Sequence, residues 1–203
     1  VNIPATNTGF VAILPTIIDQ AEQQIYRDLD LIATVRRDNS GTTTPASRNF
    51  TLPTTLGRFV VLQDINLLNG GDRTPLVKLS RPAMDWIWPS DTPTGAVPKN
   101  WAPVTDQLVL IGPSPNSAFN LECVGTIRPE ALSVSNTETF LSAELPDLFL
   151  AAGVLMTTGY MQNFGAQADD PKIATSWKAI YEQLLPGAQS EETRRKYVAR
   201  GGA

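Results

Sequence analysis

Residues 14–37 read LPTIIDQAEQQIYRDLDLIATVRR, and this stretch decides the fold class. Its apolar positions recur every three or four residues: Leu14, Ile17 or Ile18, Ala21, Ile25, Leu29 and Ile32. That spacing places them on one face of an amphipathic helix. Pro15 suits the first turn of such a helix, and the run Asn39-Ser40-Gly41 ends it. The stretch therefore predicts a long helix whose apolar face needs a partner.

The C-terminal part of the chain offers that partner. Leu145-Pro146 opens a second helix that runs to about Phe164 and is apolar on most sides, which is typical of a central, buried helix. Asp170-Pro171 starts a third helix, and Pro186-Gly187 stops it. We therefore predict that residues 14–38 and 143–187 form one helical bundle.

The middle of the chain has a different character. Most of the 16 prolines lie between positions 45 and 146, where we expect short strands and turns. Residues 50–53 are predicted to form a strand at a sheet edge. Residues 59–68 and 76–79 should form a hairpin, and the strand at 107–111 should pair with the strand at 119–127. Residues 81–89 form a helical turn, and 40–48 and 91–103 form loops. The fold class is α+β: a helical bundle with an inserted Pro-rich β section at 49–128. We expect one domain over 1–203, with 188–203 as an extended tail.

Composition excludes several classes of function. The chain has 203 residues, no histidine and one cysteine, so a Ser-His-Asp triad, a His-bearing zinc site and an intrachain disulfide are all impossible within it. Its net charge of −4 lacks the basic excess of nucleic-acid binders. No apolar run is long enough to cross a membrane, and Val1-Asn2-Ile3-Pro4 does not resemble a secretory signal. We expect no cofactor and no membrane partner.

Two groups of side chains offer alternatives to a purely structural role. Asp28, Asp30, Asp169 and Asp170 are the candidates for a carboxylate-based or metal-dependent hydrolase, which would bind divalent cations. Solvated helix surface and helix capping explain the same residues. Trp86, Trp88 and Trp101 are the candidates for a carbohydrate-binding module, although core packing explains them equally well. Cys123 lies on a predicted strand without a basic neighbour, which favours a buried, inert thiol.

The C-terminus holds the main concentration of positive charge: Arg194, Arg195, Lys196 and Arg200, with Tyr197 among them. A solvated tail is one interpretation. A docking tail for an acidic partner is the other, because Arg and Tyr are enriched at binding hot spots.

The order of motifs resembles the head–tail adaptor (connector) proteins of tailed bacteriophages. Five stretches carry the resemblance: LPTIIDQAEQQIYRDL at 14–29, FTLP at 50–53, VP at 97–98 with Trp101 and LVLIGPSP at 108–115, LS at 132–133 with NT at 136–137 and FL at 140–141, and LPDLFLAA at 145–152. The first fits the pattern LPxxIxxAExxIxRDL. The resemblance covers roughly residues 10–185.

This resemblance implies a virion structural protein without catalytic activity. Such a protein forms a ring, usually a dodecamer, beneath the portal protein at the neck of the virion. The ring extends the DNA channel, through which DNA passes without specific binding, and presents a surface for tail or nozzle proteins. Assembly takes place in the cytoplasm of the bacterial host.

On this interpretation the loops and the tail make the contacts. We expect portal docking through the C-terminal cluster, so deletion of 188–203 abolishes portal binding and spares the fold. We expect contacts with neighbouring subunits or the tail at Thr43, Pro45, Trp88 and Trp101.

Overall fold

The computed structural model describes residues 7–91, 97–161, 171–199 and 201. The chain divides into two compact units. The first, here called the helical unit, combines residues 1–33 with 130–203; the second, the β unit, is residues 34–129. The predicted α+β class is confirmed, with the β section inserted between the helices. That the whole chain behaves as one domain stays a prediction.

Helix α1 (Thr8–Asp28) opens the helical unit, with the Asn7 side chain accepting a hydrogen bond from the Phe10 amide at 3.1 Å. The predicted bounds were wrong, because the helix begins before Leu14 and ends at Asp28. Pro15 therefore lies in the helix interior. The β-branched residues after Leu31 favour extended backbone, and a short 3₁₀ turn η1 (Ile32–Thr34) leads directly into a strand.

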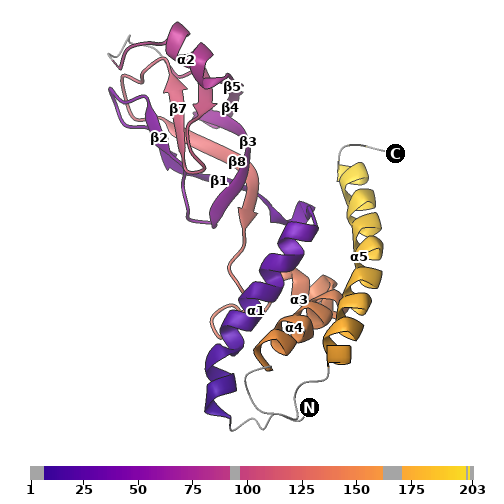
Figure 1. Cartoon of the computed structure of the whole chain (residues 1–203). Coiled ribbons are helices and arrows are strands. Elements are labelled where there is room, and N and C mark those ends of the chain that lie inside the picture. Colours follow the sequence, from indigo (N-terminus) through magenta and orange to yellow (C-terminus); the bar gives the residue numbers. More distant parts are fainter. Residues whose placement is uncertain (1–6, 92–96, 162–170, 200, 202–203) are drawn as a thin grey trace. The chain divides into compact units, whose positions relative to one another are not determined.

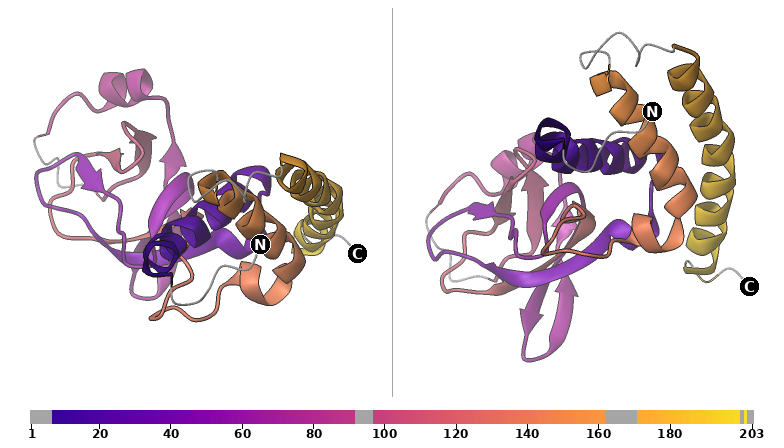
Figure 2. Two further views of the ribbon diagram at one scale, coloured as in Figure 1. Left: turned by 60° about the horizontal axis from the view of Figure 1, so that its bottom comes forward. Right: turned by 90° about the horizontal axis from the view of Figure 1, so that it is seen from below.

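Three helices complete the helical unit: α3 (Phe140–Glu144), α4 (Pro146–Met161) and α5 (Pro171–Ala199). Helix α4 packs against α1 and against α5, so it lies between them (Figure 1, Figure 2). This confirms the predicted central helix as far as Met161; residues 162–164 lie outside the described residues. The buried core of this unit comes from α1, α3, α4 and α5, and includes Ile25, Leu141, Leu148 and Tyr181.

The end of α5 differs from the prediction. Pro186 does not stop the helix, and residues 188–199 continue it rather than forming an extended tail. Proline removes one hydrogen bond of the helix, but packing of the residues after Pro186 compensates for this loss. Ala188 and Glu192, two and six residues further on, are both buried in the helical unit. Tertiary packing thus outweighs the local stop signal.

The β unit contains two four-stranded sheets (Figure 1). The first has the order β1 (Val35–Thr42), β8 (Asn120–Arg128), β3 (Arg58–Asn69), β4 (Asp72–Pro75), all antiparallel. The second has the order β2 (Asn49–Thr51), β7 (Leu108–Gly112), β6 (Asn100–Pro103), β5 (Val77–Lys78), with β5 parallel to β6. A short helix, α2 (Arg81–Ile87), packs on β6 and β7.

Both sheets contribute to one apolar core, so they face each other. Its buried members are Phe50, Leu52, Phe59, Ile65, Leu67, Leu76, Trp101, Val109, Ile111, Leu121, Cys123 and Ile127. The prediction of an inert Cys123 is confirmed: burial raises the pKa of its thiol to about 12, with smaller contributions from Asp38 and Glu122.

Three details of the predicted β section were wrong. The hairpin partner of β3 is β4, because Gly70 and Gly71 adopt positive φ and turn the chain back at once. Residues 77–78 belong to the other sheet. Strands β7 and β8 are not partners either; they lie in different sheets, and their apolar side chains meet across the core.

Candidate functional site

The three tryptophans singled out from the sequence do not form a shared binding platform. Trp101 is 1% exposed and lies in β6, not in a loop, with the Lys78 ammonium 5.1 Å from its ring centre. Trp88 is half-buried, and its indole nitrogen donates to Asn100 at 3.1 Å. Trp86 alone of the three is widely exposed, at 84%. This arrangement lacks the set of exposed rings that stacking on a sugar requires.

Both described aspartates of the hydrolase hypothesis are engaged within the helical unit. Asp28 accepts hydrogen bonds from Tyr181 Oη at 2.7 Å and from Gln24 at 2.7 Å, so it joins α1 to α5. Asp30 forms an ion pair with Lys196. Asp169 and Asp170 lie outside the described residues. Within the described part of the chain, no three histidine, cysteine or carboxylate side chains are grouped to hold a metal ion.

The residues predicted to meet neighbouring subunits have mixed exposure. Thr43 is buried and donates through its hydroxyl to the Ser117 carbonyl at 3.3 Å. Trp101, also buried, is equally inaccessible. Pro45 is exposed and Trp88 is half-buried. Of the four, Pro45 and Trp88 retain surface for an interface.

The predicted C-terminal cluster lies on the last turns of α5, except Arg200, which is outside the described residues. Arg195 contacts three carboxylates, those of Glu144, Glu191 and Glu192, and lies 5.2 Å from the centre of the Phe140 ring. Lys196 pairs with Asp30. Arg194 and Tyr197 are exposed. The cluster is therefore partly used within the helical unit.

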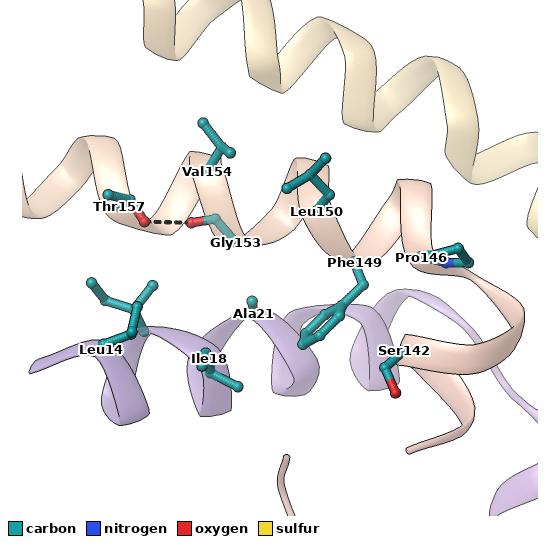
Figure 3. Close-up of a pocket in the computed structure, with 11 residues that line it drawn as sticks. Leu14, Ile18, Ala21, Ser142, Pro146, Phe149, Leu150, Gly153, Val154 and Thr157 are labelled. Carbon is teal, nitrogen blue, oxygen red and sulfur yellow. Dashed lines mark hydrogen bonds between the residues drawn. The ribbon is translucent and has the colours of Figure 1, made fainter. Parts of the chain in front are cut away.

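An apolar groove of about 520 Å³ between α1 and α4 was not anticipated (Figure 3). It is lined by Leu14, Ile17, Ile18 and Ala21 of α1, Ser142 of α3, and Pro146, Phe149, Leu150, Gly153, Val154 and Thr157 of α4. The Phe149 ring reaches from α4 to α1 beside Ala21 (Figure 3). Leu150 remains 61% exposed. Such a groove presents apolar surface that water solvates poorly.

The groove is also free of charge and of available polar groups. No charged residue occurs from Thr8 to Ile18, or in α4 after Asp147. Its two hydroxyls are engaged locally: Thr157 donates to the Gly153 carbonyl at 2.7 Å and Ser142 to the Thr139 carbonyl at 2.9 Å. The site therefore offers burial of apolar side chains rather than polar recognition. In the sequence, these two charge-free runs are the feature that indicates the groove.

Two buried glutamates hold the chain where it leaves and re-enters the helical unit. Glu22, on α1, accepts hydrogen bonds from the Leu132 amide at 3.2 Å and from the Thr139 hydroxyl at 3.2 Å. Burial raises the pKa of Glu22, while these two hydrogen bonds oppose the shift. Glu192, on α5, accepts from the Ile32 amide at 3.0 Å. Neither role was predicted, because each joins positions far apart in the sequence.

Comparisons with known proteins identify the family. Residues 4–202 match the family model described as SU10 adaptor protein. No match was found among the curated proteins. Because the match covers nearly the whole chain, the protein belongs to the SU10 adaptor protein family, a family of phage adaptor proteins, and the predicted resemblance is confirmed. The family implies a structural role rather than an enzymatic one. Among the described helices, none combines the length and apolar character that crossing a bilayer demands.

Proposed function

We propose that this member of the SU10 adaptor family forms a dodecameric ring beneath the portal protein and connects the capsid to the tail. The ring extends the DNA channel and presents a surface for tail or nozzle proteins. The net charge of −4 is consistent with a conduit, because a strongly basic lumen would retain DNA. The whole chain acts as one adaptor domain in this proposal.

The observation that carries the proposal is the apolar groove between α1 and α4. A closed ring joins each subunit to its neighbours through two different, complementary surfaces. The groove suits one of them, because it is uncharged and leaves Leu150 largely exposed. A charged occupant such as a DNA phosphate or an acidic peptide would gain no ion pair there. We therefore assign the groove to contact with a second copy of this chain.

The C-terminal turns of α5 supply the proposed portal contact. Arg194 and Tyr197 are exposed there, and both residue types are common at binding hot spots. Deletion of residues 188–203 is not a clean test, since it also removes buried Ala188 and the Glu192 contact with Ile32. Substitution of Arg194 by alanine removes a candidate contact and leaves those interactions in place.

Native mass spectrometry of the protein, alone and mixed with the portal protein of the same virus, tests the proposal. We expect a portal-dependent shift to a ring-sized complex. Leu150→Glu introduces a charge into the groove and should prevent ring closure, because burial of an unpaired carboxylate is costly. Val134→Glu is the matched control, since Val134 is 98% exposed outside the groove.

The outcomes separate the parts of the proposal. A protein that ignores the portal at all concentrations contradicts the adaptor ring. A ring that forms equally well with Leu150→Glu and Val134→Glu keeps the ring but removes the groove from its interface. Loss of the ring in both variants indicates a general effect of added charge, and this result also contradicts the groove assignment.

A further inference from the structure

The three cations on the last turns of α5 have different surroundings. Arg194 is exposed, and no ion pair to it is found within the described part of the chain. Arg195 reaches Glu144 at 3.3 Å and Glu192 at 3.3 Å and also contacts Glu191. These carboxylates raise the pKa of its guanidinium, although its partial burial opposes the shift. The proposed portal surface is therefore partly neutralised from within.

Lys196 is engaged by a second element of the helical unit. Its ammonium pairs with Asp30, which follows the end of α1. Two residues further on, the Ile32 amide donates to Glu192 of α5. The last turns of α5 thus lie across the segment after α1 and across the end of α3, where Glu144 is the last residue. We call this set of contacts, made by Asp30, Glu144, Glu191, Glu192, Arg195 and Lys196, the strap.

The ion pairs of the strap are weak enough to be exchanged. Asp30 and Glu144 are largely exposed, at 81% and 53% of their side chains. Exposed ion pairs contribute only about 0.2–1 kcal/mol each, and salt reduces them further. An acidic surface on a partner can offer Arg195 and Lys196 equivalent carboxylates at little net cost. Glu192 differs, because it is buried and also holds a backbone amide.

We propose that the strap masks the C-terminal cation surface, so that an acidic surface on the portal protein must displace Asp30 and Glu144 to bind Arg195 and Lys196. This rests on the proposed function, and it adds the regulation of that site. Arg194 is already available in the free protein, so it makes the first contact with the portal protein. Full docking follows only when the internal carboxylates are exchanged for those of the partner. The internal acids thereby lower the affinity for the portal.

The experiment compares portal binding by the full-length wild-type protein and by the double variant Asp30→Asn/Glu144→Gln. Loss of two exposed ion pairs should tighten binding roughly two- to thirtyfold. The control is Glu138→Gln/Glu182→Gln, which removes the same number of charges at exposed positions of the same unit. It should bind within about twofold of the wild type. Both variants are compared by thermal unfolding to confirm that they fold.

Ionic strength supplies a second readout. Raising the salt concentration should bring the affinities of wild type and Asp30→Asn/Glu144→Gln together, because the masking is electrostatic. Suppose that Arg194→Ala loses portal binding but that Asp30→Asn/Glu144→Gln binds no more tightly than the wild type. This result overturns the masking, while the docking site on α5 is retained. Absence of portal binding by the wild type and by every variant contradicts the proposed function itself.

Discussion

The β unit buries Glu122 and the helical unit buries Glu22 and Glu192; Glu122 and Glu192 each have an arginine partner, whereas Glu22 is satisfied in a different way. In the β unit Glu122 accepts from the Arg73 guanidinium at 3.1 Å and from Asn66 at 3.0 Å, so a cation balances its charge. In the helical unit Glu22 meets one backbone amide and one hydroxyl, and its pKa is raised by burial. A buried carboxylate whose partners are dipoles alone recovers less of the hydration energy that burial removes.

The main apolar surfaces of the two units are also arranged differently. The β unit encloses Trp101 and Phe59 between two sheets, although Trp86 stays exposed, whereas the helical unit leaves a groove open beside Leu14 and Leu150. The β unit thus has a core closed between its sheets, while the helical unit has an open apolar groove and, at Glu22, a buried carboxylate without a cation. If the proposed ring forms, the helical unit is the part that gains stability from it.

Trp101→Ala should produce the largest effect, since it tests the enclosed core of the β unit. Removal of a large buried aromatic side chain costs about 3–5 kcal/mol of unfolding free energy. Urea denaturation followed by circular dichroism measures it. Trp86→Ala, at an 84% exposed position, is the control and should stay within about 0.5 kcal/mol. Equal, small losses for both variants would contradict a closed core.

Glu22→Ala should destabilise the helical unit by about 2–4 kcal/mol, because it leaves the Leu132 amide and the Thr139 hydroxyl without their acceptor. Glu22→Gln keeps an acceptor oxygen and should lose less than about 1 kcal/mol. Urea denaturation of both variants distinguishes them. If the two substitutions cost the same, the hydrogen bonds of Glu22 do not hold the segment that returns from the β unit.

Arg73→Ala makes the corresponding change in the β unit. It leaves Glu122 with Asn66 and without a cation, and should cost about 1–2 kcal/mol, less than a fully buried pair because Arg73 is half-exposed. Arg73→Lys should restore part of the loss. The comparison between the units fails if Arg73→Ala has no effect on the urea midpoint.

The pH dependence of stability sharpens the contrast. The folded-state pKa of Glu22 is raised above its usual value of 4.5, so the folded protein binds this proton more tightly than the unfolded chain. Stability should therefore fall as pH rises from about 4.5 through the folded pKa, by at most about 1.4 kcal/mol per pH unit. Glu22→Gln should remove this component. Thermal unfolding at a series of pH values checks the sign.

Gly153→Ala should have the smallest effect, and a favourable one. Gly153 is a helical residue of α4, and a methyl group there meets, apart from its own helix backbone and chain neighbours, no atom of the described residues within 4 Å. Replacement of glycine by alanine in a helix interior typically stabilises by about 0.5–1 kcal/mol. A melting temperature below that of the wild type would show that the groove wall does not tolerate this change in the isolated chain.

Local pattern predicted the elements better than their ends or their partners. The helix from Leu14, the edge strand at Phe50 and the central helix after Pro146 follow from periodicity and turn chemistry. The end of α1 does not, because Val35 and the residues after it are drawn into pairing with β8. The continuation of α5 past Pro186 depends on the burial of Glu192, which no nearby residue reveals.

The site was less predictable than the fold for the same reason. The groove combines α1 with α4, whose residues lie more than a hundred positions apart in the chain. The glutamate contacts with Leu132 and Ile32 join equally distant segments. Side-chain type alone pointed to Trp101 and Thr43, which the β unit buries. Exposure is a property of the packed unit and has no local signature.

The burial of the single cysteine has a practical consequence. Cys123 lies at the centre of the β unit with no exposed surface, and its raised pKa keeps it protonated at neutral pH. A thiol reagent can therefore modify it only when the β unit opens. The rate of labelling reports that opening directly, without an introduced probe. A cysteine engineered on the surface of either unit would, by the same argument, react selectively and allow distances within the proposed ring to be measured.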